Sequence, residues 1–249
     1  MAGHSKWANI KHRKGAQDKK RAKIFTKIIK EITISARLGG GDVTANPRLR
    51  KAVSNGKSNN IPSEKIERAI KKGTGELEGV IYEEVIYEGY GPGGLAILMN
   101  VITDNKNRSV ADIRHILNKF NGNLGESGSV SWMFDQEGQI ILSSNTGDEN
   151  NIFEVAIEAG AADFTINKDF YIVTTSASNL MQIRDKIESY GYEIKSAEIE
   201  MVPKNFQKLN KQDSDIALKL LDVLDDNDDV NKLYSNFDII NSLCFGENK

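Results

Sequence analysis

The feature that most constrains the fold is an alternation of strand-like and helix-like segments between residues 139 and 201. β-branched and aromatic runs mark the strands, and apolar residues at three-and-four spacing mark the helices. In order, the segments are strand 140–142, helix 152–159, strand 163–166, strand 170–175, helix 180–190 and strand 192–201. The order βαββαβ is that of a ferredoxin-like sandwich. We therefore expect a ferredoxin-like α/β domain at residues 137–202.

A second α/β domain is predicted on both sides of this unit. Residues 80–87 and 95–102 are β-rich and are joined through Gly91-Pro92-Gly93-Gly94, which predicts a hairpin with a glycine-rich connection. A helix ending at Gly122 and a strand over residues 130–134 should follow. The last predicted elements are a helix around 216–224 and a strand around 230–238, too few for a domain of their own. We expect them to complete the sheet begun at Ile81, giving a discontinuous domain of residues 79–136 plus 203–249.

Residues 1–78 have a different character, with helical periodicity and many cations. An amphipathic basic helix is predicted from about Gln17 to Leu38, ended by three glycines at 39–41. Asn46-Pro47 reads as an N-cap followed by proline and opens a second helix to about Gly56. A third helix should start at Pro62-Ser63 and stop at Gly73. The fold class expected is therefore α+β and multidomain: a three-helix basic bundle plus two α/β domains, one inserted into the other.

Charge is divided very unevenly along the chain, although the formal net charge is only −2. Residues 1–75 contain 19 Lys and Arg against 5 Asp and Glu, whereas residues 76–249 contain 14 against 30. Clustered cations on one module are typical of nucleic-acid binding, because each phosphate contact releases condensed counterions. Two other interpretations stay open: a solvated basic face, or an internal clamp in which the basic end lies on the acidic remainder.

The N-terminal segment of residues 4–14 interleaves cations with one indole and two imidazoles. Because residues 1–16 have little apolar content, we expect a mobile arm. Its cations could pair with phosphates while Trp7 stacks on an unpaired base. Trp7 could equally pack with Ile10 on the bundle as an apolar anchor.

Further cations continue along the predicted bundle. Arg48, Arg50 and Lys51 follow Pro47 on a first helical turn, whose free N–H groups could add to a phosphate site. The full set of nucleic-acid-binding candidates is Lys6, Trp7, Lys11, His12, Arg13, Lys14, Lys19, Lys20, Arg21, Lys23, Lys27, Arg48, Arg50, Lys51, Lys71 and Lys72. No zinc ligands, basic zipper or helix-turn-helix pattern predicts sequence readout.

The sequence offers little for catalysis. The three histidines have no Ser/Asp or Cys/His partners nearby, and the segment Tyr90-Gly91-Pro92-Gly93-Gly94 runs into a strand, so it is no phosphate loop. We interpret this segment as a structural turn. A partner-binding loop is the less favoured alternative. The acidic run at 225–229 lacks the spacing of an EF-hand and reads as a solvated helix end or a mimic of nucleic-acid charge.

We therefore expect no catalytic residues, no metal, no cofactor and no small-molecule substrate. Cys244 is the only cysteine, and no apolar run approaches the roughly 20 residues that span a bilayer. A cytoplasmic protein that does not bind membranes is the expectation.

Five motifs closely resemble the YebC/PmpR family. They are residues 2–14 (AGHSKWANIKHRK), 46–50 (NPRLR), 60–62 (NIP), 66–73 (IERAIKKG) and 87–94 (YEGYGPGG). The resemblance runs through essentially the whole chain and implies three domains and a non-enzymatic regulator of gene expression. Bacterial relatives are described as DNA-binding transcriptional regulators. Mitochondrial relatives resemble translational activators, and some bacterial ones resemble ribosome-associated factors that relieve stalling.

Two functions therefore remain open at the level of sequence. The first is a DNA-binding transcriptional regulator, which the family description favours. The alternative is a factor that binds the ribosome or its RNA through the basic bundle, which the missing groove-reading element favours.

Overall fold

The computed structural model describes residues 17–144, 147–167 and 170–237. These residues form two compact units. The first comprises residues 17–131 and 207–237, and the second comprises residues 132–206. Each unit is described below by itself.

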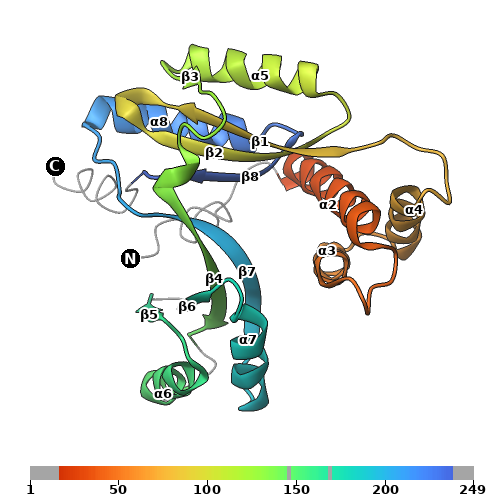
Figure 1. Ribbon diagram of the computed structural model, residues 1–249, viewed down its shortest axis with the longest axis vertical. Helices are drawn as coiled ribbons and strands as arrows, with labels where there is room; N and C mark the ends of the chain where they lie inside the picture. The colour runs from red at the N-terminus through yellow and green to blue at the C-terminus, as the bar shows by residue number, and fades with distance from the viewer. Residues whose placement is uncertain (1–16, 145–146, 168–169, 238–249) are drawn as a thin grey trace. The chain divides into compact units, whose positions relative to one another are not determined.

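Three helices open the first unit: α2 (Gln17–Gly39), α3 (Pro47–Ser58) and α4 (Ser63–Thr74). α2 packs against both of the others (Figure 1). Their apolar faces form one core, which consists of Ile28, Ile32, Ala36, Leu49, Ala52, Val53, Ile61, Ile66 and Ala69. The three-helix bundle predicted from apolar periodicity is thus confirmed.

Gly73 does not end the third helix, contrary to the prediction. α4 continues to Thr74, and Gly75 follows it in the left-handed conformation, with φ of 84°. Gly73 instead lies where α4 crosses α2: a Cβ at this position would be 2.7 Å from Ala36 Cβ and still closer to the Thr33 carbonyl oxygen. The absence of a side chain therefore lets the two helices approach closely.

We expect Gly73→Ala to destabilise the bundle by about 1–3 kcal/mol, because the added methyl group forces the two helix backbones apart. Urea unfolding monitored by circular dichroism measures the change. Gly75→Ala is the comparison variant: its Cβ would meet no atom within 4 Å, so any cost there comes only from the positive φ. A Gly73→Ala variant as stable as the wild type would show that the crossing can relax.

The first sheet has the strand order β3-β1-β2-β8 and is antiparallel throughout. The strands are β1 (Glu83–Tyr90), β2 (Ala96–Thr103), β3 (Asn123–Leu124) and β8 (Val230–Ser235). α5 (Lys106–Lys119) and α8 (Lys211–Asp225) contact each other and the sheet (Figure 1). Because β8 pairs with β2, the C-terminal segment completes the sheet begun by β1, as predicted.

Two predicted strand segments are not strands. Val80 and Ile81 are exposed and precede β1, which begins at Glu83 because its partner β2 ends at the opposite residue, Thr103. Val130 is followed by a single 3-10 turn (Ser131–Met133), and the strand begins at Phe134. β propensity was present in both segments, but the pairing partner was not.

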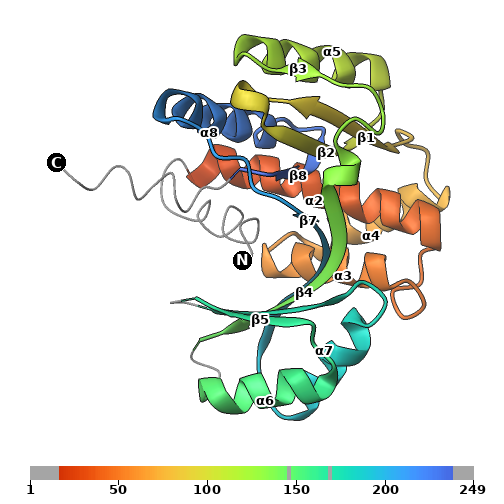
Figure 2. The same ribbon diagram turned by 60° about the vertical axis from the view of Figure 1, so that its left-hand side comes forward.

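The second unit contains the βαββαβ order predicted from the sequence. Its elements are β4 (Phe134–Ser143), α6 (Glu149–Ala159), β5 (Asp163–Ile166), β6 (Phe170–Ser176), α7 (Leu180–Ser189) and β7 (Ile194–Pro203). The strand order β5-β6-β4-β7 is that of a ferredoxin-like sheet, and α6 and α7 cover one of its faces (Figure 2).

This unit lies in the chain between β3 and β8 of the first sheet, so the predicted insertion is confirmed. β4 runs across residues 136 and 137, where the sequence placed the domain boundary. The change from one compact unit to the other occurs between residues 131 and 132, and again between 206 and 207.

Candidate nucleic-acid interface

A stripe of three lysines on α2 contacts the end of α8. Lys23, Lys27 and Lys30 recur at i, i+4 and i+7 and so lie on one face of the helix. The Lys23 amine donates to the Asp226 carbonyl at 2.8 Å, the Lys30 amine to the Asp228 carbonyl at 3.0 Å, and the Lys27 amine to the Asp225 carbonyl. Free carbonyls and the negative dipole end of a helix both attract cations. The stripe therefore serves an internal contact.

Asp229 is the centre of this contact. Its carboxylate is buried and accepts hydrogen bonds from Lys30 at 2.6 Å, Ser109 at 2.6 Å and Arg108 at 3.1 Å. Burial raises the pKa of Asp229, but these three donors outweigh burial, and the net pKa is lowered. Lysines of the basic helical bundle thus contact the acidic segment at residues 225–229. This contact matches the internal clamp, one of the interpretations of the uneven charge distribution.

Arg48 is also engaged within the protein. Its guanidinium donates two hydrogen bonds to Glu31 and two to Glu84, at distances from 2.7 to 3.2 Å. Burial lowers the pKa of Arg48, but the hydrogen bonds to both carboxylates outweigh it, so the pKa is raised. An Arg held by two carboxylates has few donors left for a phosphate.

The first turn of α3 is capped from within. The Asn46 side chain accepts from the Leu49 N–H at 3.0 Å and donates to the carbonyls of Ser35 and Gly40. Asn46 is buried, so the N-terminus of α3 does not offer the open phosphate site suggested by the sequence. Arg50 is exposed and bonds the Thr44 carbonyl at 3.0 Å, and Lys51 is exposed as well.

α3 carries the exposed cations Arg50, Lys51 and Lys57, and α4 carries exposed Lys65 and Arg68 together with half-buried Lys72. Lys65, Arg68 and Lys72 recur at i, i+3 and i+7, beside the buried face formed by Ile66 and Ala69. Lys65 and Arg68 are exposed and form no hydrogen bond or ion pair with any residue that the structure describes. We call Lys65, Arg68 and Lys72 the α4 stripe. Glu64 borders this stripe, because it lies four residues before Arg68 and so is its neighbour on the helix surface, whereas Glu67 lies farther round the helix.

Sequence reasoning found Lys72 but missed Lys65, Arg68 and the exposed Lys57 of α3. Helical spacing could have identified the stripe, because its residues avoid the apolar positions of the same helix. The cations are densest at the start of α2, so the sequence favoured α2 as the binding helix.

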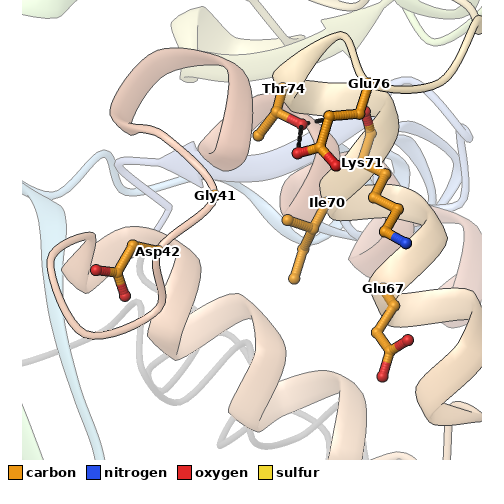
Figure 3. Close-up of a pocket in the computed structure, with 7 residues that line it drawn as sticks. All are labelled: Gly41, Asp42, Glu67, Ile70, Lys71, Thr74 and Glu76. Atoms are coloured by element: carbon orange, nitrogen blue, oxygen red, sulfur yellow. Dashed lines mark hydrogen bonds between the residues drawn. The ribbon is translucent and has the colours of Figure 1, made fainter.

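Lys71 faces a different environment. It lines an open pocket of about 410 Å³ between α4 and the α2–α3 connection, together with Asp42, Glu67 and Glu76 (Figure 3). Thr74 donates to Glu76 at 2.9 Å on the rim of this pocket (Figure 3). Three carboxylates against one ammonium group disfavour a phosphate ligand, so we do not include Lys71 in the α4 stripe.

The glycine-rich segment at 91–94 is packed as a turn. Gly91 and Pro92 are buried, and Gly93 and Gly94 have positive φ of 64° and 78°. The Tyr90 hydroxyl donates to the Ser129 carbonyl at 2.7 Å, and the Gln207 amide donates to the Gly93 carbonyl at 3.0 Å. These contacts support the structural interpretation of the segment over a partner-binding loop.

A buried carboxylate holds the segment that leads toward β4. Glu88 accepts from the backbone N–H groups of Gly128, Val130 and Ser131 at 2.7–2.8 Å, and it is only 5% exposed. Burial raises the pKa of Glu88, but the three N–H donors outweigh burial and lower it overall. Sequence reasoning did not single out Glu88, because its partners lie about 40 residues away.

Comparison with known proteins assigns the chain to a family. Residues 5–76 match the model described as the TACO1/YebC protein N-terminal domain, and residues 82–237 match the TACO1/YebC second and third domain. The chain belongs to the TACO1/YebC family. This confirms the family suggested by the five sequence motifs.

Relatives within the TACO1/YebC family span nearly the whole chain. A probable transcriptional regulatory protein of Geobacter sulfurreducens is 54% identical over 96% of both chains, and one of Magnetococcus marinus is 52% identical over 98% of both. A crystal structure of a conserved hypothetical protein from Aquifex aeolicus matches with a TM-score of 0.84 at 42% identity. It covers 93% of this chain and 96% of that chain.

Several predicted site residues of this TACO1/YebC chain lie outside the described residues: Lys6, Trp7, Lys11, His12, Arg13 and Lys14. Of Lys19, Lys20 and Arg21, the structure describes the backbone on the first turns of α2. Within the described ranges, no helix is long and apolar enough to cross a membrane, and no group of three or more His, Cys, Asp and Glu side chains could hold a metal ion.

Proposed function

We propose that this protein is a non-enzymatic regulator of gene expression that binds nucleic acid through its helical bundle, as a DNA-binding transcriptional regulator. Its bacterial relatives are named probable transcriptional regulatory proteins. The observation that carries the proposal is the α4 stripe, with Lys57 of α3 as a further exposed cation. Unpaired cations on one helix face neutralise phosphates without the prior loss of an internal ion pair.

The α4 stripe is tested by the triple variant K65E/R68E/K72E. We expect a drop in affinity for a short duplex DNA and a flatter dependence of log Kd on log salt. The slope should fall by about 2 to 3, because each lost phosphate contact removes about 0.9. Fluorescence anisotropy over a salt series measures both quantities.

K208E/K211E/K219E is the matched control. These lysines are also exposed in the first unit: Lys208 precedes α8, and Lys211 and Lys219 lie on it. The charge change is the same. We expect a smaller loss of affinity and an almost unchanged slope. Equal effects in both variants would mean that overall charge, and not the α4 stripe, attracts DNA.

The second candidate function is binding to the ribosome or its RNA, in a translation factor. It is favoured by the sequence, in which no zinc ligands, basic zipper or helix-turn-helix pattern predicts the reading of a major groove. Sedimentation with ribosomes at physiological salt, with excess duplex DNA in the same tube, separates the two functions. Retention on ribosomes would overturn the DNA proposal, whereas release into the DNA fraction would support it.

A further inference from the structure

A cavity lies beneath the connection between α4 and β1, residues 75–82, which we call the strap. The strap is held near both ends. The Leu77 N–H donates to the Lys71 carbonyl at 3.1 Å, and the Arg37 guanidinium donates to the Tyr82 carbonyl at 2.6 Å. Between these contacts the strap, α2 and α4 line a cavity of about 330 Å³. All of its lining residues belong to the first unit.

Two cations line the strap cavity, one from each helix. Arg37 lies in the last turn of α2, and Lys72 lies in the last turn of α4. The two helices are in close contact at this point, because a Cβ at Gly73 would lie 3.2 Å from the Arg37 backbone nitrogen. The close crossing at Gly73 therefore brings the two cations to one cavity.

Neither cation has a carboxylate partner among the described residues. Lys72 is half-buried and forms no hydrogen bond or ion pair with any residue that the structure describes. The strap passes over its aliphatic stem, since a Cβ at Gly79 would lie 3.0 Å from Lys72 Cδ. Arg37 uses one donor on the Tyr82 carbonyl and keeps the rest of its fork for a ligand. A half-buried ammonium group without an acceptor, beside a guanidinium with free donors, favours an anionic ligand.

The rest of the lining is largely apolar. Ile34 of α2 is buried, whereas Leu77, Val80 and Ile81 of the strap are 41–66% exposed. Glu78 is the only carboxylate among the described residues that line the cavity. This balance is the reverse of that in the pocket of Figure 3, where three carboxylates accompany one ammonium group. A cavity of this volume is within the range of small-ligand sites and is larger than a single phosphate group needs.

We propose that the strap cavity binds one unpaired nucleotide of a nucleic-acid strand. Its phosphate lies between Arg37 and Lys72, and its base packs on the aliphatic side chains of the strap. The inference rests on the proposed function and deepens it, because Lys72 belongs both to the α4 stripe and to the cavity. The α4 stripe attracts the phosphates of any strand, whereas the cavity accepts only a nucleotide that has left the base stack.

A structural role for the two cations makes a different prediction. The helix dipole alone favours a cation in the last turn of a helix. If Arg37 served only that purpose, Arg37→Gln would lower stability and leave nucleotide binding unchanged. We expect the opposite: a urea midpoint close to that of the wild type, and a loss of affinity of about tenfold or more, because charge-assisted hydrogen bonds to the phosphate are removed.

An NMR titration of the full chain, with its amides and arginine side chains labelled with ¹⁵N, tests the site. The probe is a single-stranded tetranucleotide of thymidylate. We expect saturable shifts of the Arg37 Nε–Hε signal and of the Gly79 and Val80 amides. R37Q should abolish the shifts at Gly79 and Val80. R114Q is the matched control, because Arg114 is an exposed cation of α5 and its loss changes the charge equally. Equal losses of affinity in R37Q and R114Q would overturn the proposal.

Thymidine monophosphate, titrated in the same way, separates a strand from a free nucleotide. Tighter binding of the tetranucleotide would support the strand, whereas equal affinity would assign the cavity to a free nucleotide and overturn the proposal. Shifts confined to Lys65 and Arg68 would leave the α4 stripe in place and remove the cavity from nucleic-acid binding. If duplex DNA does not bind to the α4 stripe, the proposed function fails, and the signals of Arg37 and Gly79 still decide whether the cavity takes a nucleotide.

Discussion

Replacing Asp229 with alanine should destabilise the first unit by about 3–5 kcal/mol, because it leaves the Lys30 ammonium buried without its counter-charge. Both side chains of this pair are about one-tenth exposed or less, at 10% for Lys30 and 8% for Asp229. Ser109 and Arg108 would lose the same acceptor. Chemical denaturation of the variant, monitored by circular dichroism, measures the loss.

Asp226→Ala is the control for this prediction. It removes the same charge from the neighbouring Lys23–Asp226 pair, whose side chains are 43% and 53% exposed. An exposed pair of this kind contributes about 0–1 kcal/mol. A similar loss of unfolding free energy in the two variants would show that burial does not make the Lys30–Asp229 pair more stabilising than an exposed pair.

The effect of Asp229 has a defined pH dependence. Its folded-state pKa is lowered, so its stabilisation is complete above the unfolded-state pKa of about 3.9 and is lost as the pH falls through the folded-state value. The difference in unfolding free energy between the wild type and Asp229→Ala should therefore narrow below about pH 4. A difference that grows on acidification would contradict the assignment.

Glu88→Ala should also have a large effect, of about 3 kcal/mol, because three buried or half-buried backbone N–H groups lose their acceptor together. Faster amide exchange at Gly128, Val130 and Ser131 should accompany the loss. Tyr90→Phe removes only one hydrogen bond to the same segment, at Ser129, and should cost about 1 kcal/mol. Unchanged exchange at residues 128–131 in Glu88→Ala would mean that other contacts hold this segment.

The local periodicity of the sequence was enough to predict most helices and the βαββαβ order. Asn46-Pro47 predicted the start of α3 correctly because a cap and a proline act within one turn. The strand starts at Val80 and Val130 were wrong because β-branched residues favour a strand only where a partner strand is present.

The candidate interface was harder to predict, because a lysine on a basic helix looks the same whether it faces solvent or an acidic partner. Lys30 and Asp229 are separated by 199 residues, and nothing local to α2 indicates their contact. Arg48 likewise finds Glu84 36 residues away. Gly73 was interpreted as a helix stop, although its role depends on the backbone of a second helix. Long-range pairing therefore decided which cations remain available to a ligand.

The contact between the α2 lysines and the end of α8 has a consequence for the order of events during synthesis. α2 leaves the ribosome early, but its charge partners at residues 225–229 and the sheet-closing strand β8 are translated about 200 residues later. Until then the N-terminal helix carries three uncompensated lysines and the sheet has an open edge. The first unit can reach its native state only after nearly the whole chain has been made, whereas residues 132–206 form a compact unit from contiguous sequence. The inserted unit is therefore expected to fold first, before the unit that surrounds it in the sequence.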